Sequence, residues 1–193
     1  MFCCLYYLNY KHPSSFVREA EAAAAAGESA LDCTYGAGGH SVVLAKRHCR
    51  VCALDCDIAA LTGARTHPIT LQAKVNLYNP VRELVLIDTG ASLMQAKSYW
   101  RQFSKSCDVA ASAASLVENT RTLFKHVVSS LAVGGRLLTM VYSLEFALLA
   151  YEFSKAAPAL YLLNRAFVRP NCIERLLYRC SSSARLLMFI KTK

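Results

Sequence analysis

The chain has 193 residues, of which 54% are hydrophobic and 18% charged, a balance that excludes a disordered protein and favours one globular domain spanning residues 1–193. No apolar run reaches the about 20 residues of a membrane span, because Glu145 and Glu152 interrupt the longest one. The net charge is +9, and positions 101–193 hold 13 basic against 5 acidic residues.

The positive charge is concentrated near the C-terminus, where eight basic residues and a single acidic one, Glu174, occur from Phe153 onward. Such a cationic segment suits the phosphate backbone of a nucleic acid, and a solubilising surface is the equally weighted alternative. The residues that we expect to contact RNA are Arg165, Arg169, Arg175, Arg179 and Arg185.

The nine cysteines are odd in number and irregularly spaced, which indicates free thiols in a reducing compartment. Cys49, Cys52 and Cys56, with His48 beside them, include the C-x-x-C spacing of some zinc sites. However, the residues between Cys49 and Cys56 are predicted to form a buried strand, on which neighbouring side chains point to opposite faces. We therefore expect no metal site.

Short apolar runs alternate with helical patterns along the chain. The first helix is predicted within Arg18–Gly27, with acidic residues in its first turn and Gly27 ending it. Further strands are predicted at 30–34, 51–54, 69–75, 84–87, 136–141, 159–168 and 184–191, and further helices at 40–48, 58–66, within 109–131 and at 144–155. This α/β alternation predicts a doubly wound, mostly parallel sheet with an antiparallel C-terminal strand.

The first predicted strand runs into the segment Asp32–His40, which holds three glycines in four positions before a helix. Glycines allow a sharp turn close to a ligand, and the amides at a helix start suit a carboxylate or a phosphate. The next predicted strand ends at Asp55, whose carboxylate can accept hydrogen bonds from both hydroxyls of a ribose. Together these features are typical of the binding site of a nucleoside-containing cofactor. The alternative interpretation is a tight strand-to-helix turn beside a solvated Asp55 that binds no ligand.

Two weaker features follow in the chain. The strand at 84–87 is followed by Asp88, which is either a second site carboxylate or an ordinary surface residue. Residues 131–137 are predicted to be a helix-to-strand turn that carries the pair Gly134-Gly135. In this order, the features match an S-adenosylmethionine-dependent methyltransferase of the Rossmann-like class I.

The string D-C-T-Y-G-A-G-G-H-S at residues 32–41 resembles the first motif of the MraW/RsmH family, which methylates the exocyclic amine of a cytosine in small-subunit ribosomal RNA. Further segments resemble that family in its own order, at residues 10–13, 54–59, 88–95, 134–137, 142–145 and 183–186. The resemblance therefore spans nearly the whole chain.

The resemblance implies that the cofactor is S-adenosyl-L-methionine. It implies that the methionine part is surrounded by Gly38, Gly39 and His40, that the ribose is held by Asp55, and that the adenosine and sulfonium side is closed by Asp88 and Gln95. It also implies that the partners are ribosomal RNA and the small ribosomal subunit or its assembly intermediate. With the free thiols, it suggests a mitochondrial location, or a cytoplasmic one if the protein is bacterial.

The chain departs from the family pattern in three places, one of which is the family's N-P-R-x-R segment, which has no convincing counterpart around residues 178–182. Tyr142 and Phe146 stand where the family motif F-H-S-L-E-D has its histidine and final aspartate, so no catalytic residue is assigned. Only about 38 residues separate Gln95 from Gly134, too few for the family's helical insertion. Two hypotheses stay open: an active cytosine amine methyltransferase, and a catalytically inactive relative that serves as a structural or assembly factor. A small-molecule methyltransferase is weaker, because it leaves the cationic segment unexplained.

Overall fold

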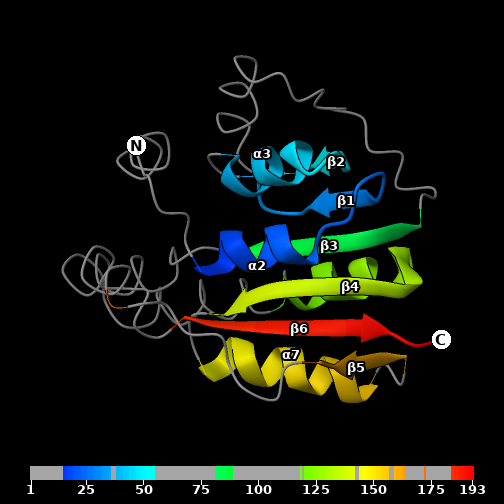
Figure 1. Cartoon of the computed structure of the whole chain (residues 1–193). Coiled ribbons are helices and arrows are strands. Elements are labelled where there is room, and N and C mark those ends of the chain that lie inside the picture. The colour runs from blue at the N-terminus through cyan, green and yellow to red at the C-terminus, as the bar shows by residue number, and fades with distance from the viewer. Residues whose placement is uncertain are drawn as a thin grey trace.

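The computed structural model describes residues 15–35, 38–54, 81–88, 118, 120–141, 144–156, 159–163, 172 and 184–193. Within them, a six-stranded sheet has the order β2-β1-β3-β4-β6-β5 (Figure 1). Its strands are β1 (Ser29–Asp32), β2 (Arg50–Ala53), β3 (Arg82–Asp88), β4 (Leu131–Val141), β5 (Leu160–Leu162) and β6 (Arg185–Lys191).

The sheet is mostly parallel. Strands β2, β1, β3 and β4 are parallel neighbours, whereas β6 is antiparallel to both β4 and β5. The predicted α/β architecture, with an antiparallel strand at the C-terminus of the chain, is therefore confirmed.

Helices cover both faces of the sheet (Figure 1). One face packs against α2 (Ser15–Ala23) and α3 (Gly39–Lys46), and the other against α7 (Leu144–Ala156) and the helical segment 120–130. The central strand β3 therefore has no solvent face, and its residues 84–87 are all 0% exposed. Burial on both sides explains why this strand is a continuous apolar run in the sequence. Among the described helices, none has the length and apolarity to cross a membrane.

The first helix differs from its predicted bounds at both ends. It begins at Ser15 with no acidic residue in its first turn, and it ends at Ala23. The earlier start follows from Phe16, which is buried against the sheet and makes the preceding turn part of the packed helix. Gly27 lies beyond the helix with a φ of +83°, in the turn where its N–H donates to the His48 carbonyl oxygen at 3.0 Å.

The pair Gly134-Gly135 does not form the predicted helix-to-strand turn. The helical segment ends at residue 130, and β4 begins directly at Leu131. The register between β3 and β4 shifts near the start of both strands, which makes the pair part of a bulge. Gly134 has a φ of +79°, and a Cβ at Gly135 would lie 2.8 Å from the Ala132 carbonyl oxygen. The backbone itself therefore requires both glycines.

Some predicted elements lie outside the described residues, namely the helix at 58–66, the strand at 69–75 and the parts 109–117 and 164–168 of two others. The strands predicted at 30–34, 51–54, 84–87 and 184–191 and the helices at 40–48 and 144–155 are confirmed, with small differences at their ends.

Lys191, at the end of β6, joins the sheet to the C-terminal end of helix 120–130. Its Nζ donates to the carbonyl oxygens of Val128 at 2.9 Å and Leu131 at 2.8 Å. Carbonyl groups at a helix end lack partners inside the helix, so the ammonium group stabilises this junction.

We predict that Lys191→Met lowers the free energy of unfolding by about 1–2 kcal/mol, because two hydrogen bonds from a charged donor are lost. Urea denaturation measures this change. Lys193→Met removes the same charge from an exposed residue and should alter the stability by less than about 0.5 kcal/mol. Equal effects of the two substitutions would contradict the assignment.

Candidate functional site

The carboxyl ends of β1 and β3 lie side by side where the strand order reverses, since β1 pairs with β2 on one side and with β3 on the other. Beyond the paired residues, the Cys33 N–H donates to the Leu86 carbonyl oxygen at 2.9 Å, and the Asp88 N–H donates to Thr34 Oγ1 at 2.8 Å. These bonds hold the loop after β1 against the end of β3. In open α/β sheets, this switch point is where ligands bind.

Asp32, the last residue of β1, is completely buried. Its carboxylate accepts hydrogen bonds from the Ser41 hydroxyl at 2.7 Å and from the Thr34 N–H at 3.1 Å. Burial raises the pKa of Asp32, against the opposing effects of His40 and of these hydrogen bonds. Because Ser41 belongs to the first turn of α3, the carboxylate ties strand, loop and helix together. Asp32 is therefore a positioning residue.

His40 and Asp88 lie close together, with 4.0 Å between His40 Nε2 and Asp88 Oδ2 and side-chain exposures of 8% and 14%. The ring of Phe16, from α2, meets the imidazole edge-on at a centroid distance of 4.6 Å. His40 Nε2 is buried and has no hydrogen-bond partner among the described residues. A buried polar atom without a partner is costly, so a ligand that supplies one gains binding free energy.

Gly38 is the N-cap of α3, with a left-handed φ of +79°. A Cβ at this position would lie only 2.6 Å from the Tyr35 hydroxyl oxygen. Glycine is therefore required here by the backbone and by the contact with Tyr35. Gly38 provides no side-chain cap, so the amide groups of the first turn, those of Gly39 and His40 included, suit an anionic group.

Asp55 and Gln95 lie outside the described residues. The end of β2 is described, however, and it lies against the loop after β1. The Leu54 N–H donates to the Asp32 carbonyl oxygen, and the Tyr35 N–H donates to the Leu54 carbonyl oxygen, both at 2.8 Å. The residue that precedes Asp55 therefore borders the glycine loop.

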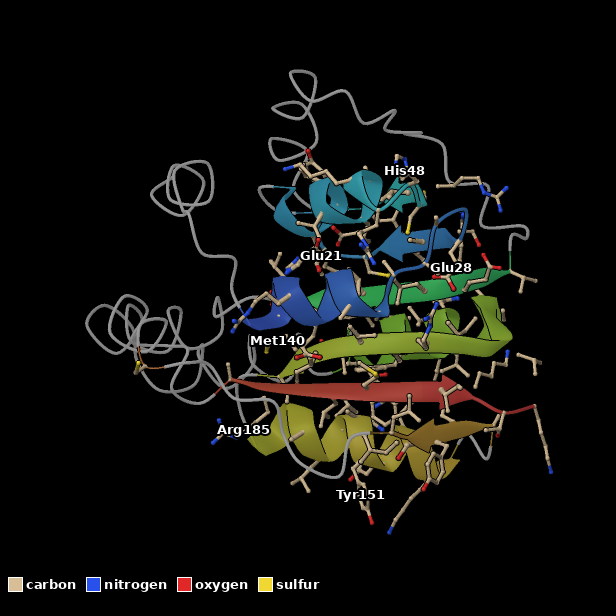
Figure 2. The ribbon with its side chains drawn as sticks, viewed as in Figure 1. Glu21, Glu28, His48, Met140, Tyr151 and Arg185 are labelled. Carbon is tan, nitrogen blue, oxygen red and sulfur yellow. The ribbon has the colours of Figure 1, made fainter. Side chains whose placement is uncertain are left out.

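Among the predicted RNA-binding residues, Arg185 is described and begins β6. It pairs with Val141, the last residue of β4, which places it at the same edge of the sheet as Asp88, the partner of Met140 in β4. Figure 2 shows Arg185 and Met140 on this side of the molecule. Its guanidinium donates to the Ala184 carbonyl oxygen at 2.7 Å. The residues outside the described part are Arg165, Arg169, Arg175 and Arg179.

The described cysteines of the C-x-x-C segment, Cys49 and Cys52, are buried free thiols. Burial raises the pKa of both, and Cys49 Sγ lies 3.3 Å from the Ala25 carbonyl oxygen, to which it donates. Throughout the part of the chain that the structure describes, no three histidine, cysteine or acidic residues gather closely enough to hold a metal ion.

Three residues of this site were not singled out from the sequence: Asp32, Ser41 and Tyr35. An acidic residue ending an apolar strand could have pointed to Asp32, because a carboxylate is buried only where other groups bond to it. No sequence signal marks Tyr35, whose place is apparent only from its packing against Gly38.

No protein-family model and no curated protein matches the chain, whereas many solved structures do. A putative rRNA-methylase from Clostridium thermocellum aligns with a TM-score of 0.60 at 14% identity, over 95% of this chain and 99% of that one. TrmN from Thermus thermophilus aligns with a TM-score of 0.59 at 17% identity over 92% of this chain. The chain spans about half (47%) of the length of TrmN. The T. thermophilus 16S rRNA N2 G1207 methyltransferase RsmC, in complex with AdoMet and guanosine, aligns with a TM-score of 0.55 at 16% identity. The alignment covers 95% of this chain and 40% of RsmC. The chain therefore has the Rossmann-like class I methyltransferase fold.

Gly38→Ala is predicted to destabilise the protein more than Gly27→Ala. Both positions have a left-handed φ, +79° and +83°, which costs a residue with a Cβ about 1–2 kcal/mol. Nothing lies within 4 Å of a Cβ at Gly27, whereas one at Gly38 meets Tyr35. Denaturant unfolding should show a loss of about 3 kcal/mol or more for Gly38→Ala. Equal losses would show that Tyr35 does not pack as described.

The raised pKa of Asp32 predicts a pH-dependent stability. The folded protein holds the proton of Asp32 to a higher pH than the unfolded chain, in which the pKa of this group has its ordinary value of 3.8. The contribution of Asp32 to the free energy of unfolding is therefore complete below pH 3.8 and is lost as the pH rises through the folded-state pKa. We predict that Asp32→Asn gains stability relative to the wild type as the pH rises from about 4 toward neutrality, measured by urea denaturation. A difference that is independent of pH would contradict this.

Proposed function

We propose that the chain binds S-adenosylmethionine and transfers its methyl group to ribosomal RNA. The observation that carries this proposal is the close pair of the buried His40 and the half-buried Asp88, which lies at the N-terminus of α3 and at the switch point of the sheet. These residues fit the cofactor, because helix-start amides suit its carboxylate and His40 Nε2, which has no hydrogen-bond partner among the described residues, suits a further polar group. When bound, the cofactor supplies an electrophilic methyl group.

In this proposal, the chain holds the cofactor at three places. Gly38, Gly39 and His40 take the methionine end, Asp55 accepts hydrogen bonds from the ribose, and Asp88 with Gln95 orients the adenosine and sulfonium side. The order of the motifs in the MraW/RsmH family supports these roles. Correct alignment of the reacting atoms can lower the activation barrier by about 7–11 kcal/mol. The hydrogen bonds that hold the loop after β1 against β3 therefore support catalysis by fixing the position of the cofactor.

The proposed methyl acceptor is the exocyclic amine of a cytosine in small-subunit ribosomal RNA, in the mitochondrion. The family resemblance supports this acceptor, and the names of the fold neighbours support an RNA substrate. Arg185 lies at the same sheet edge as Asp88, so phosphate contacts at this edge would bring a nucleotide toward the site. Extraction of the base from its stack costs a few kcal/mol, which contacts of the cationic segment can offset.

A second candidate function is that of a catalytically inactive factor of the small ribosomal subunit. It is favoured by Tyr142 and Phe146, which replace the family's histidine and aspartate. Met140 pairs with Asp88, and β4 ends one residue later, so the motif containing both substitutions follows the strand beside the site. The motif that follows this strand therefore lacks the polar groups of the family.

Calorimetric titration with S-adenosylmethionine tests the proposed function. We predict binding by the wild type and an affinity at least roughly tenfold lower for Asp88→Asn, because hydrogen bonds to a charged group are lost. Glu152→Gln, which neutralises an exposed carboxylate on α7, serves as the matched control and should bind as the wild type does. The absence of binding by the wild type at millimolar ligand would contradict the proposal.

Ribosomal RNA from cells depleted of the protein distinguishes the two candidate functions. Loss of one methylated cytosine is the result expected for the enzyme. Unchanged methylation together with a stalled small subunit would instead identify the inactive factor.

A further inference from the structure

Tyr35 is the second residue at the glycine loop with a buried polar atom that lacks a partner. Its side chain is 3% exposed, and its hydroxyl has no hydrogen-bond partner among the described residues. The other such atom at this loop is His40 Nε2. Two unpartnered polar atoms within six residues of sequence are unusual, because buried polar groups in folded proteins are nearly always hydrogen-bonded.

The position of the Tyr35 ring is closely determined. The Tyr35 N–H donates to the Leu54 carbonyl oxygen at 2.8 Å, and the Tyr35 carbonyl oxygen accepts from the Gly38 N–H at 2.7 Å. The Cζ and hydroxyl oxygen lie 2.7 and 2.6 Å from where a Cβ of Gly38 would stand. The hydroxyl therefore lies against the N-cap of α3, beside first-turn amides to which the N-cap Gly38 offers no side-chain acceptor.

Packing alone does not explain a tyrosine here. A phenylalanine ring would fill the same space against Gly38 without burying an unsatisfied hydroxyl, which is costly. Burial and the neighbouring Asp32 raise the pKa of Tyr35, so the hydroxyl keeps its proton and donates. A hydroxyl donor beside the amide donors of a helix start forms a set that suits an anionic acceptor.

We propose that the Tyr35 hydroxyl donates a hydrogen bond to the carboxylate at the amino-acid end of the ligand, and thereby selects ligands that carry this group over truncated nucleosides. This inference rests on the proposed function, because it assumes a cofactor of the S-adenosylmethionine type. It adds a specificity-determining residue that the motif of three glycines and a histidine does not include.

The test compares two ligands that share an adenosine and a thioether. S-adenosylhomocysteine carries the amino-acid carboxylate, and 5′-methylthioadenosine lacks it. We predict that Tyr35→Phe weakens binding of the first by roughly tenfold and leaves binding of the second unchanged, measured by calorimetry. The matched control is Tyr161→Phe on the edge strand β5, whose side chain is 54% exposed and which should bind both ligands as the wild type does.

A measurement without ligand supports the comparison. Because Tyr35→Phe removes an unsatisfied buried hydroxyl, the ligand-free variant should melt roughly 2–4 °C higher than the wild type. A purely structural tyrosine whose hydroxyl bonds inside the protein would give a lower melting temperature.

The outcomes separate the inference from the proposed function. Absence of S-adenosylhomocysteine binding by the wild type contradicts the proposed function and the inference with it. Binding by the wild type with an equal affinity for Tyr35→Phe overturns only the inference. Equal weakening for both ligands also overturns it, since the hydroxyl would then contact the nucleoside part.

Discussion

The buried carboxylate of Asp32 is the constraint on which the geometry of this site depends. It bonds the Ser41 hydroxyl and the Thr34 N–H, so that the end of β1, the loop after it and the first turn of α3 are held as one unit. Its main-chain carbonyl oxygen also accepts the Leu54 N–H, which brings in the end of β2. A carboxyl group removed from water is tolerated only with such partners, and their directions determine where the loop can lie.

Polar and charged side chains are arranged differently at the carboxyl ends of the parallel strands and at their amino ends. At the carboxyl ends of the parallel strands lie His40, Asp88 and Arg185, around the loop where polar atoms lack partners. At the opposite edge, where Figure 2 labels Glu28, charged side chains pair with groups of the protein itself.

Basic side chains at the opposite edge are engaged within the protein and are therefore less available to contact RNA. Arg136 forms an ion pair with Glu28, and Lys191 bonds two carbonyl oxygens of a helix end. Glu83 accepts hydrogen bonds from the N–H and the hydroxyl of Ser29, which lower its pKa. Arg136 and Lys191 are therefore engaged within the fold, and Arg185 lies at the edge better placed to contact phosphate.

The fold was predictable from the sequence because burial on both faces leaves continuous apolar runs, as in residues 84–87 of β3. The bounds of the alanine-rich helix and the bulge at Gly134 were not, since they depend on the packing of Phe16 and on the register of neighbouring strands. At the site, sequence motifs identified His40 and Asp88, which the structure brings to within 4.0 Å. Tyr35 was not identified, because its contact with Gly38 exists only in the folded loop.

The most direct test of the central claim is an NMR titration of the ¹⁵N-labelled protein with S-adenosylhomocysteine, followed through the backbone amide signals. The account predicts that the signals of Gly38, Gly39, His40 and Asp88 move with ligand concentration, while those of Ser29 and Glu83 at the opposite edge of the sheet stay in place. Shifts confined to the opposite edge, or no shifts at millimolar ligand, would contradict it.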